Sequence, residues 1–153
     1  MQLPLNIQHE HEFGCDDFIV SCCNLEAFNL LHNSISWHDN RLIILGEEGS
    51  GKTHLTKIWQ QESSAVVLRE GYDFSALDGT KTSIIIEDIE QIKNEEYLFH
   101  LINFAKNNSE SLLMTASSSP CFKLNDLQSR INATHKALIK KPDDELISIV
   151  LHI

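Results

Sequence analysis

Residues 46–53 read Gly-Glu-Glu-Gly-Ser-Gly-Lys-Thr and directly follow the apolar run Arg41–Leu45. This is the complete pattern of Gly, four residues, Gly-Lys and Ser or Thr that is typical of polyphosphate-binding loops. Its glycines let the backbone curl until several N–H groups point at one phosphate group, and the next helix adds its positive end. Lys52 would neutralise the β and γ phosphates. The sequence therefore predicts a nucleotide site, with an ordinary glycine turn as the alternative. The residues predicted to bind nucleotide in this segment are Gly46, Gly49, Ser50, Gly51, Lys52, Thr53 and His54.

A second motif lies further along the chain. Ile84-Ile85-Ile86 is strand-like, because β-branched residues favour strands, and Glu87 and Asp88 follow it directly. Two carboxylates at a strand end can hold Mg²⁺ and orient a water, and Thr53 would offer its hydroxyl to the same ion. The sequence predicts a Mg²⁺ site of Thr53, Glu87 and Asp88, with the two acids taking part in catalysis. Asp is the more usual first acid, and the extra methylene of Glu87 could shift the metal or slow hydrolysis.

Strand-like and helix-like segments alternate along the chain, which is typical of a parallel sheet covered by helices on both faces. Apolar and β-branched runs predict five strands, at 41–45, 65–68, 83–86, 111–115 and 135–139. Apolar residues at helical spacing predict helices at 25–35, from 52, at 94–107, at 124–131 and from 142. We expect Asn24 to cap the first helix and the stretch 71–82 to be a loop.

Composition indicates one globular domain and excludes some partners. The chain of 153 residues has 12 Lys and Arg against 22 Asp and Glu, a net charge of 12 − 22 = −10. Nonspecific nucleic-acid binding depends on Lys and Arg, so direct DNA binding is not expected. No segment resembles an export signal or a membrane span, so we expect a cytoplasmic protein without membrane contact. The four cysteines form no Cys-x-x-Cys pair and are expected to be free thiols.

With these motifs placed, the chain resembles the DnaA-related AAA+ ATPases, and among them the Hda-like regulators of replication initiation. The resemblance rests on an ordered set of segments that covers nearly the whole chain. These are Phe18-Ile19-Val20 with Asn24, the loop 46–53, 86–90, Leu98-Phe99-His100-Leu101-Ile102-Asn103, 112–116, Leu127-Gln128-Ser129-Arg130 and 141–146.

The resemblance implies a fold and a domain division. The fold would be α/β, a three-layer P-loop domain of AAA+/ASCE type with helices on both faces. Its five-stranded parallel sheet would have the strand order 5-1-4-3-2. Residues 1–17 would form an arm and 18–153 the nucleotide-binding domain. Family members continue into a helical lid, and this chain stops at Ile153, inside what resembles the first lid helix. Without that wall, nucleotide affinity and hydrolysis are expected to suffer.

The resemblance also implies roles for residues outside the two motifs. The base and ribose would lie near Phe18 and Val20. Ser117 falls at the polar sensor position after the fourth strand, where the family often has an acidic or amide residue. Arg130 stands where these proteins carry an arginine finger, which stabilises charge on a phosphoryl group held by another protein. The alternative for Arg130 is an ordinary surface arginine on a short helix.

The first residues, Met1-Gln2-Leu3-Pro4-Leu5, resemble the peptide with which Hda-like proteins bind the DNA sliding clamp. Gln2 can donate and accept hydrogen bonds, Leu3 and Leu5 can fill apolar pockets, and Pro4 stiffens the peptide before binding. An ordinary chain terminus is the alternative.

The leading hypothesis is a regulator that binds ATP or ADP with Mg²⁺, docks on the sliding clamp and stimulates hydrolysis of ATP bound to the DnaA initiator. Weak or no intrinsic ATPase activity is expected, and homodimer formation is left open. One alternative is a residual nucleotide-binding module without a lid or regulatory output. Another is a P-loop enzyme, such as a helicase-loader-like ATPase or a small-molecule kinase.

Overall fold

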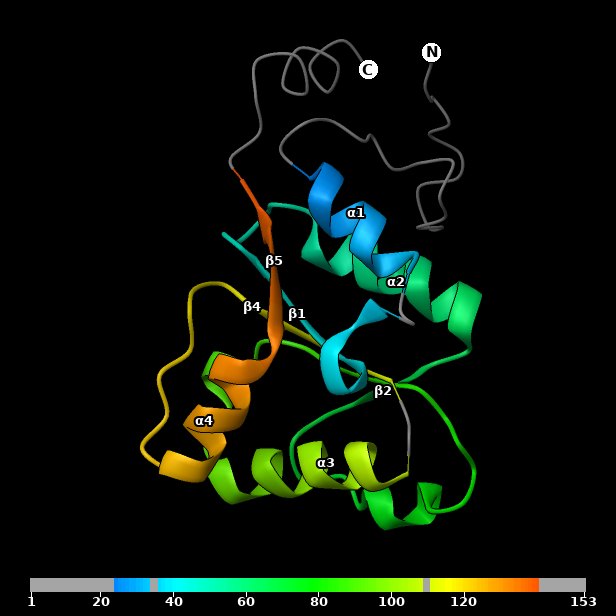
Figure 1. The fold of residues 1–153 in the computed structure, drawn as a ribbon, viewed down its shortest axis with the longest axis vertical. Coiled ribbons are helices and arrows are strands. Elements are labelled where there is room, and N and C mark those ends of the chain that lie inside the picture. Colours follow the sequence, from blue (N-terminus) through cyan, green and yellow to red (C-terminus); the bar gives the residue numbers. More distant parts are fainter. Residues whose placement is uncertain (1–23, 34–35, 109–110, 141–153) are drawn as a thin grey trace, which may run out of the picture.

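The computed structural model describes residues 24–33, 36–108 and 111–140. Its centre is a five-stranded sheet in which every neighbouring pair of strands is parallel (Figure 1). The order across the sheet is β2-β3-β4-β1-β5, which is the predicted order 5-1-4-3-2 counted from the other edge. The α/β class and strand order are therefore confirmed. The strands are β1 (Arg41–Gly46), β2 (Val66–Leu68), β3 (Ile84–Ile86), β4 (Leu112–Ala116) and β5 (His135–Ile139).

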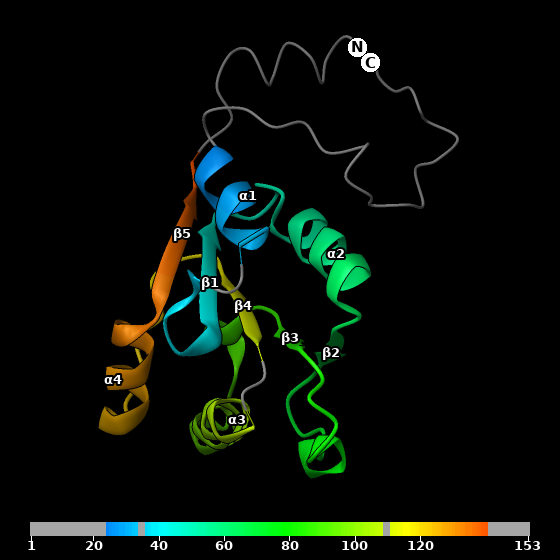
Figure 2. The same cartoon turned by 45° about the vertical axis from the view of Figure 1, so that its right-hand side comes forward.

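Helices cover both faces of the sheet and make the fold three-layered (Figure 2). One face carries α1 (Leu25–Leu31) and α2 (Lys52–Ser63), and the other carries α3 (Glu95–Asn107) and α4 (Asn125–Ala133). Three short 3-10 turns complete the described elements, η4 (His38–Asn40), η5 (Phe74–Leu77) and η6 (Ile89–Gln91). None of the described helices is long and apolar enough to cross a membrane.

The two core layers follow from the alternation of side chains along each strand. In β1, Leu42 and Ile44 pack toward α1 and α2, whereas Ile43 and Leu45 pack toward α3 and α4. Residues 41–46 are all buried, because helices cover both faces of this strand. A central parallel strand therefore reads as a continuous apolar run in the sequence.

The predicted elements differ from the observed ones mainly at their ends. The strands predicted from 65, 83 and 111 each begin one residue later, and the predicted loop 71–82 contains the turn η5. The first helix, predicted to reach residue 35, ends at Leu31. The predicted cap at Asn24 is wrong, because its side chain makes no capping hydrogen bond. Its φ of −127° and ψ of 6° are not the extended conformation that capping needs.

Several predictions concern residues outside the described ranges. These are the arm 1–17 with Gln2, Leu3 and Leu5, the base-contacting residues Phe18 and Val20, three of the four cysteines, and the helix from 142 with the start of the lid. The fourth cysteine, Cys121, is an exposed free thiol.

The core makes a direct stability prediction. Ile85 is fully buried in β3, and its register neighbour Val67 in β2 is 42% exposed. Ile85→Ala should lower the free energy of unfolding by about 2–5 kcal/mol through lost burial and a residual cavity. Val67→Ala, the matched control, should change it by about 0.5 kcal/mol or less. Urea denaturation measures both, and equal losses would contradict the core assignment.

Candidate nucleotide-binding site

The phosphate-loop residues lie where the carboxyl ends of the parallel strands meet. β1 ends at Gly46, the loop follows, and α2 begins at Lys52. Beside this loop is a cavity of about 390 Å³, which also receives residues that follow β3 and β4. Its lining residues are Glu48, Gly49, Gly51, Lys52, Thr53, His54, Asp88, Gln91 and Ser117. The fold thus brings most of the predicted nucleotide site to one place, with room for an anion.

Two glycines fix the course of the loop for different reasons. Gly51 caps α2 with φ 107°, a conformation that residues with side chains rarely adopt. At Gly46 a Cβ would clash with Ser50 Oγ and lie 3.1 Å from Ile139 Cβ. The Ser50 hydroxyl is buried against Gly46 without a hydrogen-bond partner, and the Ser50 N–H donates to Glu47 O at 3.0 Å. The backbone N–H of Ser50 is therefore used within the loop, and its hydroxyl is the group left without a partner.

Lys52 holds the loop in its curled form. The side chain is only 7% exposed, and its ammonium group donates to the carbonyl oxygen of Gly46 and, at 3.1 Å, to that of Glu47. These neutral acceptors are weaker partners for an ammonium group than phosphate oxygens, because ionised acceptors form stronger hydrogen bonds. The site therefore keeps its cation desolvated and beside the cavity in which a phosphate would lie.

The first predicted carboxylate lies against the loop threonine. Thr53 Oγ1 donates to Glu87 Oε1 at 3.3 Å, and Thr56 Oγ1 lies 3.5 Å from the same oxygen. The longer Glu side chain therefore still reaches the hydroxyl predicted to share its metal ion. Mg²⁺ is usually held by one or two carboxylates together with substrate phosphates and waters, so this donor set fits an ion bound jointly with nucleotide.

Asp88 differs from Glu87 in its surroundings. It adopts the left-handed conformation (φ 55°, ψ 52°), and its N–H donates to Thr115 Oγ1 at 3.0 Å. The residue is exposed and lines the cavity. Within the described ranges, no three His, Cys, Asp or Glu residues are close enough together to hold a metal ion. Of the two predicted metal ligands, Glu87 is therefore the one in contact with Thr53, whereas Asp88 lines the cavity.

Ser117 directly follows β4 and lies beside the phosphate loop. It faces two cavities, and one of them is also lined by residues of β5. It lines both the cavity described above and a second cavity of about 290 Å³, which is bounded by the loop and by Leu138, Ile139 and Lys140. Its N–H donates to Glu90 Oε1 at 3.3 Å. Sequence reasoning missed this role of Glu90, since no spacing rule links it to Ser117.

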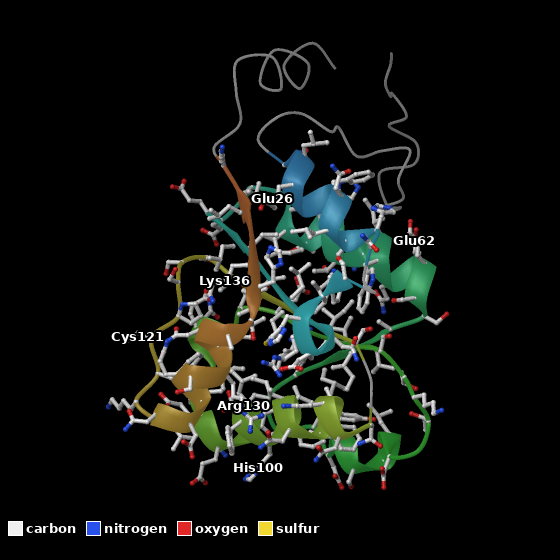
Figure 3. The ribbon with its side chains drawn as sticks, viewed as in Figure 1. Glu26, Glu62, His100, Cys121, Arg130 and Lys136 are labelled. Atoms are coloured by element: carbon white, nitrogen blue, oxygen red, sulfur yellow. The ribbon has the colours of Figure 1, made fainter. Side chains whose placement is uncertain are left out.

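Among the predicted site residues that the structure describes, Arg130 is the one that the fold separates from the loop. It lies in the last turn of α4 and points toward α3 (Figure 3). Its Nη1 donates to Asn103 Oδ1, and its guanidinium carbon lies 5.5 Å from the centre of the Phe99 ring. The side chain is thus held on the surface where α3 and α4 pack together.

The position of Arg130 along the sheet follows from its backbone contacts. Its carbonyl oxygen lies 3.5 Å from Nη2 of Arg41, the first residue of β1, whereas the phosphate loop follows Gly46, the last residue. A strand of this length spans about 20 Å. Arg130 therefore lies near the amino-terminal edge of the sheet and cannot reach a nucleotide bound in its own chain's loop.

The sheet order and the loop between β1 and α2 define a P-loop domain of the AAA+/ASCE fold class. The chain is similar to the crystal structure of a DNA replication initiation factor (TM-score 0.74, 17% identity), covering 93% of this chain and 54% of that one. It is also similar to AMPPCP-bound DnaA from Aquifex aeolicus (TM-score 0.69, 18% identity; 90% and 53% covered).

A third similar structure is the DnaC helicase loader (TM-score 0.57, 16% identity), with 86% of this chain and 97% of that one covered. The chain spans about half the length of the first two structures. No protein-family model and no curated protein sequence matches it. At these identities the likeness establishes the fold alone, which this chain shares with the structures named.

Lys52→Ala should weaken binding of ADP and ATP by about tenfold or more, because a charge-assisted hydrogen bond contributes about 1.5–3 kcal/mol. Isothermal titration calorimetry measures the affinity, and circular dichroism checks the fold. The matched control is Lys57→Ala, which removes an exposed lysine from the same helix and should leave affinity unchanged. Equal affinities for wild type and Lys52→Ala would show that the phosphate site is wrongly assigned.

Glu87→Gln tests the metal position separately from the phosphate position. The amide can still accept the hydrogen bond from Thr53 but is a poor Mg²⁺ ligand, so the gain in nucleotide affinity on adding Mg²⁺ should fall by about tenfold or more. Affinity in EDTA should stay at the wild-type value. Asp126→Asn on α4, far from the loop, serves as the control. An unchanged Mg²⁺ effect in Glu87→Gln would remove Glu87 from the site.

Proposed function

We propose that the chain is a DnaA-related AAA+ nucleotide-binding protein that regulates replication initiation. It binds ATP or ADP with Mg²⁺ at the loop 46–53 and presents Arg130 to the nucleotide of the DnaA initiator, stimulating hydrolysis there. The supporting observation is that Arg130 lies near the amino-terminal end of β1, whereas the loop follows its carboxyl-terminal end. An arginine placed in this way can act only on a nucleotide held by another molecule.

The chemistry at Arg130 suits that role. A guanidinium group has five N–H donors in a fixed planar arrangement, and Asn103 accepts from one nitrogen while Phe99 lies beside the group. The remaining donors can form paired hydrogen bonds with phosphate oxygens. An arginine that stabilises the negative charge on a phosphoryl group during its transfer contributes about 10³–10⁵-fold in rate. The protein itself would show weak or no ATPase activity.

The proposal includes docking on the DNA sliding clamp through Gln2, Leu3 and Leu5. These residues lie outside the described ranges, and the proposal here rests on the peptide's chemistry alone. One polar side chain flanked by apolar ones, stiffened by Pro4, suits a shallow apolar pocket with a polar rim. Docking would bring the chain to DNA without DNA contacts of its own, which suits its net charge of −10.

The second candidate is a helicase-loader-like ATPase. The likeness to the DnaC helicase loader favours it, because that similarity covers 97% of the DnaC chain. The two functions differ in their partners. A loader would bind a replicative helicase, whereas the regulator would stimulate ATP hydrolysis by DnaA. A residual module without regulatory output would bind neither protein specifically.

Arg130→Ala should abolish stimulation of DnaA-bound ATP hydrolysis, reducing the stimulated rate by about 10³-fold or more. The assay measures phosphate release by DnaA with the clamp loaded on DNA. Arg69→Ala is the matched control, since this exposed arginine follows β2, the opposite edge strand of the sheet from β5. A wild-type chain that gives no stimulation would rule out the proposed function, and so would equal stimulation by Arg130→Ala.

A further inference from the structure

Arg41 is a buried arginine that packs against the last turn of α4. Its side chain is 1% exposed, and its Nε donates to Thr134 Oγ1 at 3.0 Å. Thr134 Oγ1 in turn donates to the carbonyl oxygen of Arg130 at 2.7 Å, and Arg41 Nη2 lies 3.5 Å from the same oxygen. One guanidinium group therefore joins the start of β1 to the backbone of the residue proposed to act on the partner's nucleotide.

A contribution to folding stability does not by itself explain why an arginine is buried here. Arg41 Nη1 is buried without a hydrogen-bond partner, and the nearest carboxylate, that of Asp39, is 3.8 Å from Nη2. Burial lowers the pKa of Arg41; the Asp39 carboxylate raises it, and the nearby charge of Arg130 lowers it further. Replacing a buried ion pair by apolar groups of similar size is often neutral or stabilising. Because the Asp39 carboxylate is 33% exposed and stays solvated without Arg41, an apolar residue such as Met could fill a purely structural role here.

The surrounding charges leave Arg130 free to meet an anion. Asp39 Oδ2 is shared between Arg41 and Lys106, whose Nζ is 3.9 Å away, and also contacts His38 at 3.4 Å. Among the described residues, Arg130 has no carboxylate within ion-pair distance. Two cations, Arg41 and Lys106, thus share one carboxylate on a chain whose overall charge is −10. The local excess of positive charge suits an incoming phosphate group.

We propose that Arg41 is a positioning residue for Arg130. It fixes the last turn of α4 through Thr134 and the Arg130 carbonyl, so that the Arg130 guanidinium is presented at one place and in one orientation. This inference rests on the proposed function. A small displacement of a group that acts on a transition state can cost about 100-fold in rate, so fixing the backbone beneath it has a measurable consequence.

The test uses Arg41→Met in the full chain. Met fills the volume of the aliphatic stem, so the midpoint of urea unfolding should stay at the wild-type value or rise. The maximal stimulated rate of hydrolysis of DnaA-bound ATP should fall by about 10- to 100-fold. The concentration that gives half-maximal stimulation should not change. Hydrogen exchange at the backbone amides of residues 130–134 should become faster, which is a readout independent of activity.

Asp39→Asn gives the opposite pattern and serves as the control. It leaves the Arg41 hydrogen bonds in place but removes the countercharge of a buried cation, so the unfolding midpoint should fall. The maximal stimulated rate of the folded protein should stay near wild type. If Arg41→Met does not fold, Arg41→Lys replaces it, because an ammonium group cannot reproduce the planar contacts of a guanidinium. Its stimulated rate should also fall.

The outcomes separate this inference from the proposed function. If the wild-type chain does not stimulate hydrolysis, the proposed function fails and the inference falls with it. If wild type stimulates, Arg130→Ala does not, and Arg41→Met stimulates fully, then only the inference is overturned. It is also overturned if the rate lost by Arg41→Met parallels a loss of stability, or if Arg41→Lys keeps the full rate.

Discussion

The parallel direction of all five strands is the constraint on which the arrangement of functional groups depends. Parallel strands bring their carboxyl ends to one edge, so groups far apart in the sequence meet there. The phosphate loop begins at Gly46, the last residue of β1, and Glu87 after β3 and Ser117 after β4 reach it in this way. The same constraint sends the helix before β5 back to the other edge, which is why Arg130 lies beside the first residue of β1. One rule therefore accounts both for the assembled site and for the separated arginine.

The fold was predictable because its strongest signals are local. Buried parallel strands read as apolar runs, and the loop 46–53 requires a strand before it and a helix after it. The contact between Thr53 and Glu87 followed from placing two motifs at the same sheet edge. The order of the strands came from the family resemblance and not from the periodicity, since period and length do not specify which strands are neighbours.

Other features could not be predicted, because they depend on tertiary contacts between distant residues. Asn24 is a good capping residue by type, yet its backbone conformation keeps its side chain from that role. Arg41 reads as the polar start of a strand, but the fold buries it against Thr134. No local pattern places Glu90 against the N–H of Ser117. Each of these requires knowing which segment packs against which, and that information is not local in the sequence.

The likeness to both initiators and a helicase loader shows how little the fold alone says about function. The loop and its metal position are features that such proteins could share whatever they act upon. The proposed regulatory function is distinguished from the loader function by the role proposed for Arg130, whose contacts are with Asn103 and Phe99. The loop conformation is already curled around Lys52, so the cost of ordering it on binding is reduced.

The opposite placement of Arg130 and the phosphate loop also limits the symmetry of any assembly that uses both. In a two-fold pair each contact is made twice, so the Arg130 of each copy would have to meet the phosphate loop of the other across one shared surface. If the two groups instead lie on separate surfaces, copies of this chain join head to tail, and repeated addition gives a ring or a filament. Contact through Arg130 with a different nucleotide-binding protein has no such symmetry requirement. It can form a complex of just two chains.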